Sequence, residues 1–193
     1  MSKTTDPLAT PMMQQYLATK AEHPDCLLFM RMGDFFELFL DDAREAAQLL
    51  GITLTSRNKG EANEIPMAGV PHHSLQGHLP KLMAAGKKIA IMDQLEDPAT
   101  AKGLVKRGLT RIITPGTLID EDALDDASAN LLVAVTALDG LIGIAALDVS
   151  TGRFHVEEAD GATACGLALA RLQPVELLLP EVLFDEQLDA KLD

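Results

Sequence analysis

Short apolar runs alternate with longer amphipathic segments along the first 118 residues of this chain. The run 26–32 is followed by a glycine, which is typical of a buried strand, and segment 34–51 carries apolar residues at helical spacing. We expect that segment to be a helix with Asp34 as its N-cap, Glu37 completing a capping box and Gly51 at its end. Strands that alternate with helices predict an α/β layer domain. The same reasoning predicts helices over 10–22 and 74–86, strands over 52–58, 88–94 and 109–115, and a loop over 64–74.

The second part of the chain has a different pattern. Three strand-like runs, 130–138, 141–150 and 152–158, are separated by turn residues and predict an antiparallel meander. A helix over 163–173 and a last strand over 174–181 follow. This β-β-β-α-β order resembles the opening of the ribonuclease H-like α/β fold.

A turn signal and an acidic segment separate the two parts. Thr-Pro-Gly-Thr at 114–117 is followed by IDEDALDDASAN at 119–130. We therefore predict a first domain over 1–118, an acidic linker over 119–128 and a second, incomplete domain over 129–193.

The net charge of −13 is distributed unevenly along the chain. Residues 1–118 hold 13 basic and 13 acidic residues, whereas residues 119–193 hold 3 basic and 16 acidic ones. Within the first part, residues 57–111 carry nine basic against five acidic residues, a net charge of +4. A polyanion such as nucleic acid can therefore bind the first part and is repelled by the second.

Composition narrows the class of protein. Hydrophobic residues make up 47% of the 193 residues, which argues against a disordered chain. No apolar run reaches the length of a membrane span, and the N-terminus lacks the pattern of a secretory signal. Cys26 and Cys165 stand far apart and outside any metal-binding spacing. We expect a cytoplasmic protein without membrane contact, in which both cysteines are buried.

Three motifs suggest enzymatic or metal chemistry, and each has a simpler interpretation. Asp148 ends a strand, where a ribonuclease H-like nuclease carries a metal ligand, but an Asp before Ser-Thr-Gly is also a common turn former. His72, His73 and His78 cluster in one segment without a Cys or carboxylate at ligand spacing. Gly86-Lys87 lacks the upstream glycine and the following Ser or Thr of a phosphate-binding loop.

The segment Met32–Phe39, MGDFFELF, combines aromatic side chains with a carboxylate just after a strand. On a helix, Phe35 and Phe36 each begin an apolar stripe, so periodicity does not decide which ring is exposed. Glu37 could close the capping box or contact a ligand. The pattern therefore leaves both a structural and a functional interpretation open.

At this point the sequence resembles the N-terminal part of the bacterial MutS DNA mismatch repair proteins. The matching segments cover residues 12–118 in the same order as in the family. They are HPDCLLFMRMGDFFELFLDDA, ITLTSR, IPMAGVPHHS, KLMAAGKKIAIMDQLEDP and RIITPGT. The resemblance implies a mixed-sheet mismatch-recognition domain followed by a ribonuclease H-like connector domain that is not a nuclease. In that family the F-x-E motif contacts the mismatch, so Phe35 carries over as the stacking wedge and Glu37 as the base-contacting carboxylate. Phe36 stands where many relatives have tyrosine.

The resemblance also implies partners and further contacts. Mismatched double-stranded DNA is the expected ligand, a MutL-type repair protein and a homodimer are expected partners, and Met32 and Met67 could pack at the wedge. Relatives carry their ATPase, with ATP and magnesium, in a C-terminal part, so we expect this chain to be a non-enzymatic fragment without a cofactor. A nuclease centred on Asp148 and a protein-interaction module without DNA contact remain the alternatives. The candidate contacts to the DNA backbone are Arg57, Lys59, Lys106, Arg107 and Arg111.

Overall fold

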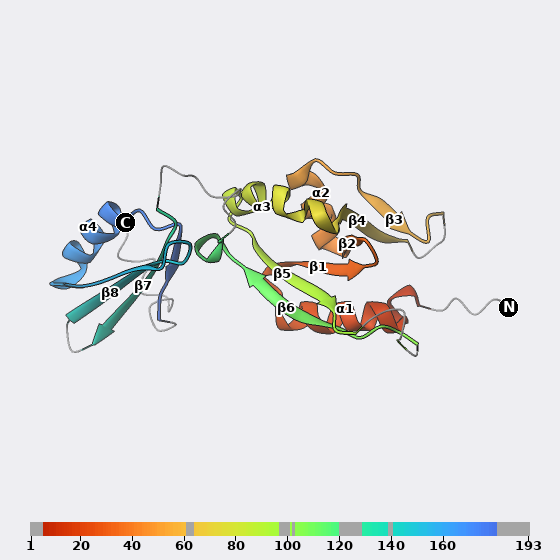
Figure 1. The fold of residues 1–193 in the computed structure, drawn as a ribbon, viewed down its shortest axis with the longest axis horizontal. Helices are drawn as coiled ribbons and strands as arrows, with labels where there is room; N and C mark the ends of the chain where they lie inside the picture. The colour runs from red at the N-terminus through yellow and green to blue at the C-terminus, as the bar shows by residue number, and fades with distance from the viewer. Residues whose placement is uncertain are drawn as a thin grey trace. The chain divides into compact units, whose positions relative to one another are not determined.

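The computed structural model describes residues 6–60, 64–96, 101, 103–119, 129–138 and 141–180. The chain divides into two compact units, residues 1–114 and 115–193 (Figure 1). Residues 115–118, which the sequence prediction assigns to the first domain, are therefore grouped with the second unit. Of the predicted acidic linker, residues 120–128 lie outside the described residues.

The first unit is a mixed sheet between helices. Its order is β3-β4-β2-β1-β5-β6, in which β1 and β5 run parallel and the other pairs antiparallel. Helix α1 lies on one face, and α2 and α3 lie on the other (Figure 1). The predicted mixed-sheet α/β fold is confirmed. The bounds are α1 Pro11–Glu22, β1 Cys26–Met32, β2 Phe35–Phe39, α2 Leu40–Leu50, β3 Thr55–Arg57, β4 Ile65–Pro71, α3 Leu75–Ala84, β5 Lys88–Gln94 and β6 Arg107–Ile113, with short 3₁₀ turns at Pro7–Ala9 and His72–Ser74.

The segment after β1 is a strand and not the start of a helix, so the predicted helix over 34–51 is wrong in its first part. Residues Phe35–Phe39 form β2, which pairs with β1 through a two-residue turn at Gly33 and Asp34. Gly33 has φ +59°, a conformation that suits glycine in such a hairpin turn. Asp34 is consequently not an N-cap and Glu37 does not close a capping box, because α2 begins only at Leu40.

The predicted loop over 64–74 is also wrong in part, because Ile65–Pro71 form strand β4 between β3 and β2. Two prolines in this segment favoured the loop interpretation. Pro66 stands one residue from the start of the strand and Pro71 at its end, where a missing N–H is tolerated.

A buried polar cluster joins α1 to the end of β2. The Asp42 carboxylate accepts hydrogen bonds from the Tyr16 hydroxyl at 2.9 Å and the Leu28 N–H at 3.0 Å, and pairs with Lys20 at 2.9 Å. The Tyr16 hydroxyl also accepts a hydrogen bond from the Phe39 N–H, and the two rings pack edge to face. These contacts fasten the point where β2 turns into α2, so the strand that carries Phe35 and Glu37 is anchored at its far end.

The second unit is a four-stranded sheet with one helix. Its order is β10-β7-β8-β9, with β10 parallel to β7 and the other pairs antiparallel. This is the β-β-β-α-β order expected from the sequence. The bounds are a 3₁₀ turn at Pro115–Thr117, β7 Leu131–Leu138, β8 Leu141–Asp148, β9 Arg153–Ala159, α4 Gly161–Leu172 and β10 Glu176–Leu178.

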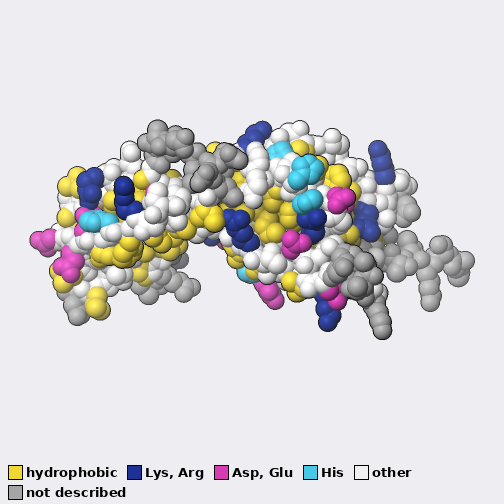
Figure 2. Space-filling view, viewed as in Figure 1, with side chains coloured by type: hydrophobic (Ala, Val, Ile, Leu, Met, Phe, Trp, Pro, Cys, Tyr) yellow, Lys and Arg dark blue, Asp and Glu magenta, His cyan; other side chains and the backbone are white. Residues whose placement is uncertain are grey.

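One face of this second sheet packs against α4 around Val133, Ile144 and Cys165. Large apolar side chains such as Phe154 and Val156 are exposed on its strands, and Figure 2 shows hydrophobic side chains at the surface of this unit. Both cysteines are free and buried, as expected. Among the described residues, no helix is long and apolar enough to cross a membrane.

Candidate nucleic-acid interface

Strand β2 presents Phe35 and Glu37 on one face of the first sheet. Alternate residues of a strand point to opposite faces, so Phe35 and Glu37 share the α1 side while Phe36 and Leu38 point to the side of α2. Phe35 is 45% exposed, whereas Phe36 is buried, with the Arg31 guanidinium 5.6 Å from its ring centroid. The structure thus distinguishes two rings that helical periodicity could not.

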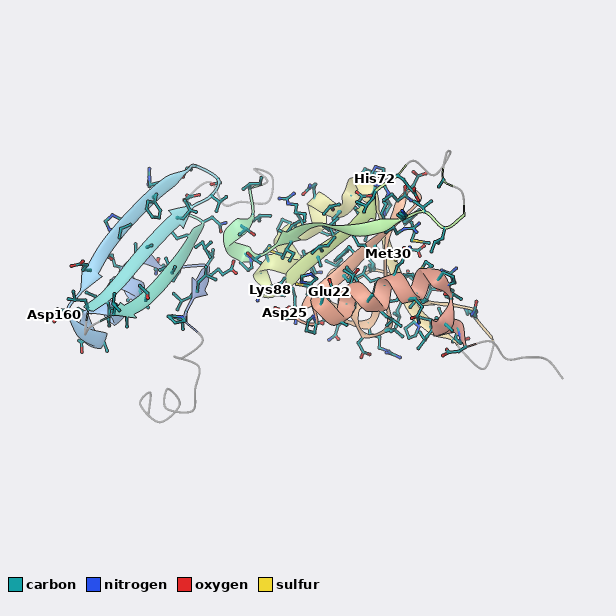
Figure 3. The ribbon with its side chains drawn as sticks, turned by 90° about the horizontal axis from the view of Figure 1, so that it is seen from below. Glu22, Asp25, Met30, His72, Lys88 and Asp160 are labelled. Atoms are coloured by element: carbon teal, nitrogen blue, oxygen red, sulfur yellow. The ribbon has the colours of Figure 1, made fainter. Side chains whose placement is uncertain are left out.

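Hydrogen bonding to the residue that follows β4 fixes the turn before β2. The backbone N–H of His72, which follows β4, donates to the Asp34 carbonyl at 2.8 Å, and the imidazole Nδ1 lies 3.2 Å from the same oxygen. Asp25 and Lys88, which form an ion pair and are labelled in Figure 3, stand at the start of β1 and β5, whereas this turn follows the end of β1, so the two features lie at opposite ends of these strands. No sequence pattern predicts this role for His72, because its partner is a backbone carbonyl 38 positions away in the chain.

Glu37 is half-buried beside two uncharged neighbours, Met30 on β1 and Gly69 on β4. A Cβ atom at Gly69 would stand 3.2 Å from the Phe36 carbonyl oxygen and 3.6 Å from the Glu37 Cγ, so glycine leaves space beside the carboxylate. No hydrogen bond or ion pair to this carboxylate is present among the residues that the structure describes. Its oxygens are therefore available to a donor from a ligand.

Burial raises the pKa of the Glu37 carboxyl, and the positive charges of Arg57 and Arg107 oppose that rise. Both arginines share the face of Glu37, because paired residues and every second residue of a strand lie on the same face. Arg57 pairs with Ile65, which is in the core under α1. Arg107 pairs with Gln94, which lies two residues after Met92, another residue of that core. The structure thus brings four of the predicted site residues to one face, two at the mismatch motif and two cations.

The three other predicted backbone contacts are placed differently. Lys59 and Lys106 are exposed in the turns that follow β3 and precede β6. Arg111 pairs with Ile91 on β5 and so lies on the opposite face of the sheet from Glu37. Met32 and Met67, which could pack at the wedge, are partly buried against the core under α1.

Asp148 and the cluster of His72, His73 and His78, which the sequence suggested for metal chemistry, do not form a metal-binding group among the described residues. The Asp148 carboxylate accepts hydrogen bonds from the Ser150 hydroxyl at 2.6 Å and from the backbone N–H groups of Ser150 and Thr151. The Ser150 bond contributes most to a lowered pKa of Asp148. This is the side-chain-to-backbone turn that the sequence suggested as the simpler interpretation. Within the described part of the chain, no group of three His, Cys, Asp or Glu side chains could hold a metal ion.

Comparison with protein families agrees with the two units. A model of MutS domain I matches residues 10–122, and a model of MutS domain II matches residues 130–192. Domain I is the mismatch-recognition domain and domain II the connector, so the two matches support a role in DNA recognition during mismatch repair. The chain therefore belongs to the MutS family and comprises its domain I followed by its domain II.

Proposed function

We propose that the first unit senses mismatched base pairs by inserting Phe35 into the duplex while Glu37 contacts the displaced base. The observation that carries this proposal is that Phe35 and Glu37 lie on the same face of β2. The Phe35 ring is exposed, and the half-buried Glu37 carboxylate has no hydrogen bond or ion pair among the described residues. Neither feature stabilises the fold, because an exposed ring buries little surface and an unpaired carboxylate loses hydration.

The physical basis of discrimination is the cost of opening the duplex. An apolar side chain inserted from the minor groove unstacks a base step at a cost of a few kcal/mol and kinks the DNA. A mismatched pair is less stable and costs less to open, so the same wedge binds it more tightly.

Glu37 adds a second criterion. An ionised carboxylate is repelled by phosphates, so it favours binding only where a displaced base donates a hydrogen bond to it. A matched duplex offers no such donor, and the carboxylate then opposes binding.

We expect Glu37→Gln to raise the affinity for matched duplex and to reduce the ratio of mismatched to matched affinity. Competition binding of the wild type and of Glu37→Gln to a matched duplex and to one with a single mismatch would measure both affinities in each protein. Weaker binding to matched duplex in Glu37→Gln would contradict the proposed repulsion.

The same variant also has a predicted effect on stability. Because burial raises the pKa of Glu37 in the folded protein, the ionised carboxylate disfavours folding, and stability falls as the pH rises through that pKa. Glu37→Gln removes this loss, so we expect a higher free energy of unfolding than wild type at pH 7 and no such gain at a pH below the carboxyl pKa of the unfolded chain. Urea unfolding at both pH values measures the difference. A lower free energy of unfolding in Glu37→Gln than in the wild type at pH 7 would contradict this prediction.

The exposed cations Arg57, Lys59 and Lys106 are proposed to contact phosphates. At pH 8, where Glu37 is expected to stay ionised without this neighbour, Arg57→Met should weaken binding to matched and mismatched duplexes equally and reduce the slope of log affinity against log salt by about one. Arg153→Met is the control, because Arg153 is an exposed arginine on β9 in the second unit. A loss confined to one mismatch would show that Arg57 reads bases and does not hold the backbone.

A further inference from the structure

Arg107 is fixed in a way that the other candidate DNA contacts are not. Its Nε donates to the Arg31 carbonyl on β1 at 2.8 Å, and its Nη1 donates to the Val105 carbonyl at 3.0 Å. The side chain begins on β6 and reaches β1, so it crosses β5, which lies between them. The guanidinium is thereby held on the sheet next to the turn that leads into β2.

This geometry leaves Arg107 fewer donors for a phosphate than a free guanidinium has. Of its five N–H groups, the Nε–H and one Nη1–H already bond to backbone carbonyls, so the side-on pair of Nε and Nη2 is not available for a two-bond phosphate contact. Arg107 is also half-buried, and burial lowers its pKa, whereas Arg57, Lys59 and Lys106 are exposed. Desolvation of a cation is unfavourable unless a nearby negative charge compensates for it.

The compensating charge is Glu37. The Arg31 carbonyl that holds the Arg107 Nε lies next to Met30 on β1, and Met30 pairs with Glu37 on β2. Glu37 is also the one charged group that acts on Arg107 among the described residues, while Arg57 and, to a smaller extent, Arg107 are the cations that act on Glu37. The neighbours of Glu37 on the adjoining strands, Met30 and Gly69, carry no charge. Since Arg57 is exposed and has no fixed partner among those residues, Arg107 is the cation whose position relative to the carboxylate is set by the fold.

We propose that Arg107 is a positioning residue that keeps Glu37 in its charged form and so maintains the discrimination between mismatched and matched duplexes. The inference rests on the proposed role of Glu37. Without the guanidinium, Glu37 becomes protonated at a higher pH, and a neutral carboxyl no longer repels matched DNA. Arg107 thus acts on the mismatch through Glu37, without touching a base.

The first test uses the free protein. The pKa of Glu37 is measured by an NMR titration of its carboxyl in the wild type, Arg107→Met, Arg107→Lys and Arg111→Met. We expect a higher pKa in Arg107→Met, a value nearer the wild type in Arg107→Lys, which keeps the charge, and no change in Arg111→Met, which removes a cation from the same strand on the opposite face. Equal pKa values in the wild type and Arg107→Met would overturn the inference whatever the protein binds.

The second test measures the ratio of mismatched to matched affinity against pH for the native protein and the two Arg107 variants. We expect the pH at which the ratio falls to move upward in Arg107→Met, the ratio at pH 8 to remain that of the wild type, and Arg107→Lys to restore the profile. If Arg107 instead binds phosphate, both affinities fall equally at every pH and the salt slope decreases by about one, which overturns the inference. A wild-type protein without any mismatch preference would refute the proposed function, while the titration still reports on the Arg107–Glu37 coupling.

Discussion

Phe35→Ala is expected to remove most of the preference for mismatched over matched duplex while leaving the fold intact. Stacking of an aromatic side chain on a base is worth about 1 to 3 kcal/mol, which corresponds to a decrease of roughly 5-fold to 150-fold in affinity for the mismatch. Phe35 is 45% exposed, so its loss removes little buried surface. Competition binding with matched and single-mismatch duplexes, beside a thermal melt, measures both effects.

The neighbouring ring provides the control. Phe36 is buried on the opposite face, so Phe36→Leu should lower the melting temperature and leave the ratio of mismatched to matched affinity unchanged. If Phe36→Leu abolished the preference and Phe35→Ala did not, the wedge would be the wrong ring.

The largest effect on stability is expected from Asp42→Ala. The substitution leaves Lys20 without its buried partner and deprives both the Tyr16 hydroxyl and the Leu28 N–H of an acceptor. Breaking a buried ion pair by removing one partner costs about 3 to 5 kcal/mol. We expect the free energy of unfolding, measured in urea, to decrease by that amount.

Asp41→Ala is a matched control one residue away. Asp41 is almost fully exposed, and Arg44 on the same helix is its one ion-pair partner among the described residues, so its loss should change stability by no more than about 0.5 kcal/mol. Equal effects at the two positions would mean that the cluster around Asp42 does not anchor the junction of β2 and α2.

Sequence patterns predicted the elements whose apolar residues form a long run or a clear helical stripe. Strand β1 and helix α1 agree with the prediction because an unbroken apolar run and a Thr-Pro helix start each have one simple interpretation. Strand β2 was missed because F-F-E-L-F fits the first turn of a helix as well as a strand. Only its pairing with β1 and β4 decides between them, and that pairing is tertiary.

The candidate site could also be predicted only in part. The sequence motifs singled out Phe35, Glu37 and the candidate cations, but they did not predict that these residues are distributed over two faces of a sheet. Arg107 and Arg111 are similar in the sequence, four positions apart on one strand. The register shift between Ile91 and Met92 on β5 is what places them on opposite faces, since residues four apart on a regular strand share one face. No local pattern in the sequence marks such a bulge.

The hairpin that carries Phe35 has a further consequence for how affinity can change. Strand β2 is bonded along both of its edges, to β1 and to β4, so its backbone is ordered before any ligand arrives. A loop of equal length would have to lose backbone entropy on binding, at about 1 to 2 kcal/mol for each residue that becomes fixed. Exchanges of the side chains at positions 35 and 37 therefore leave the backbone of β2 in place, which allows binding selectivity to change at these two positions without a rearrangement of the sheet.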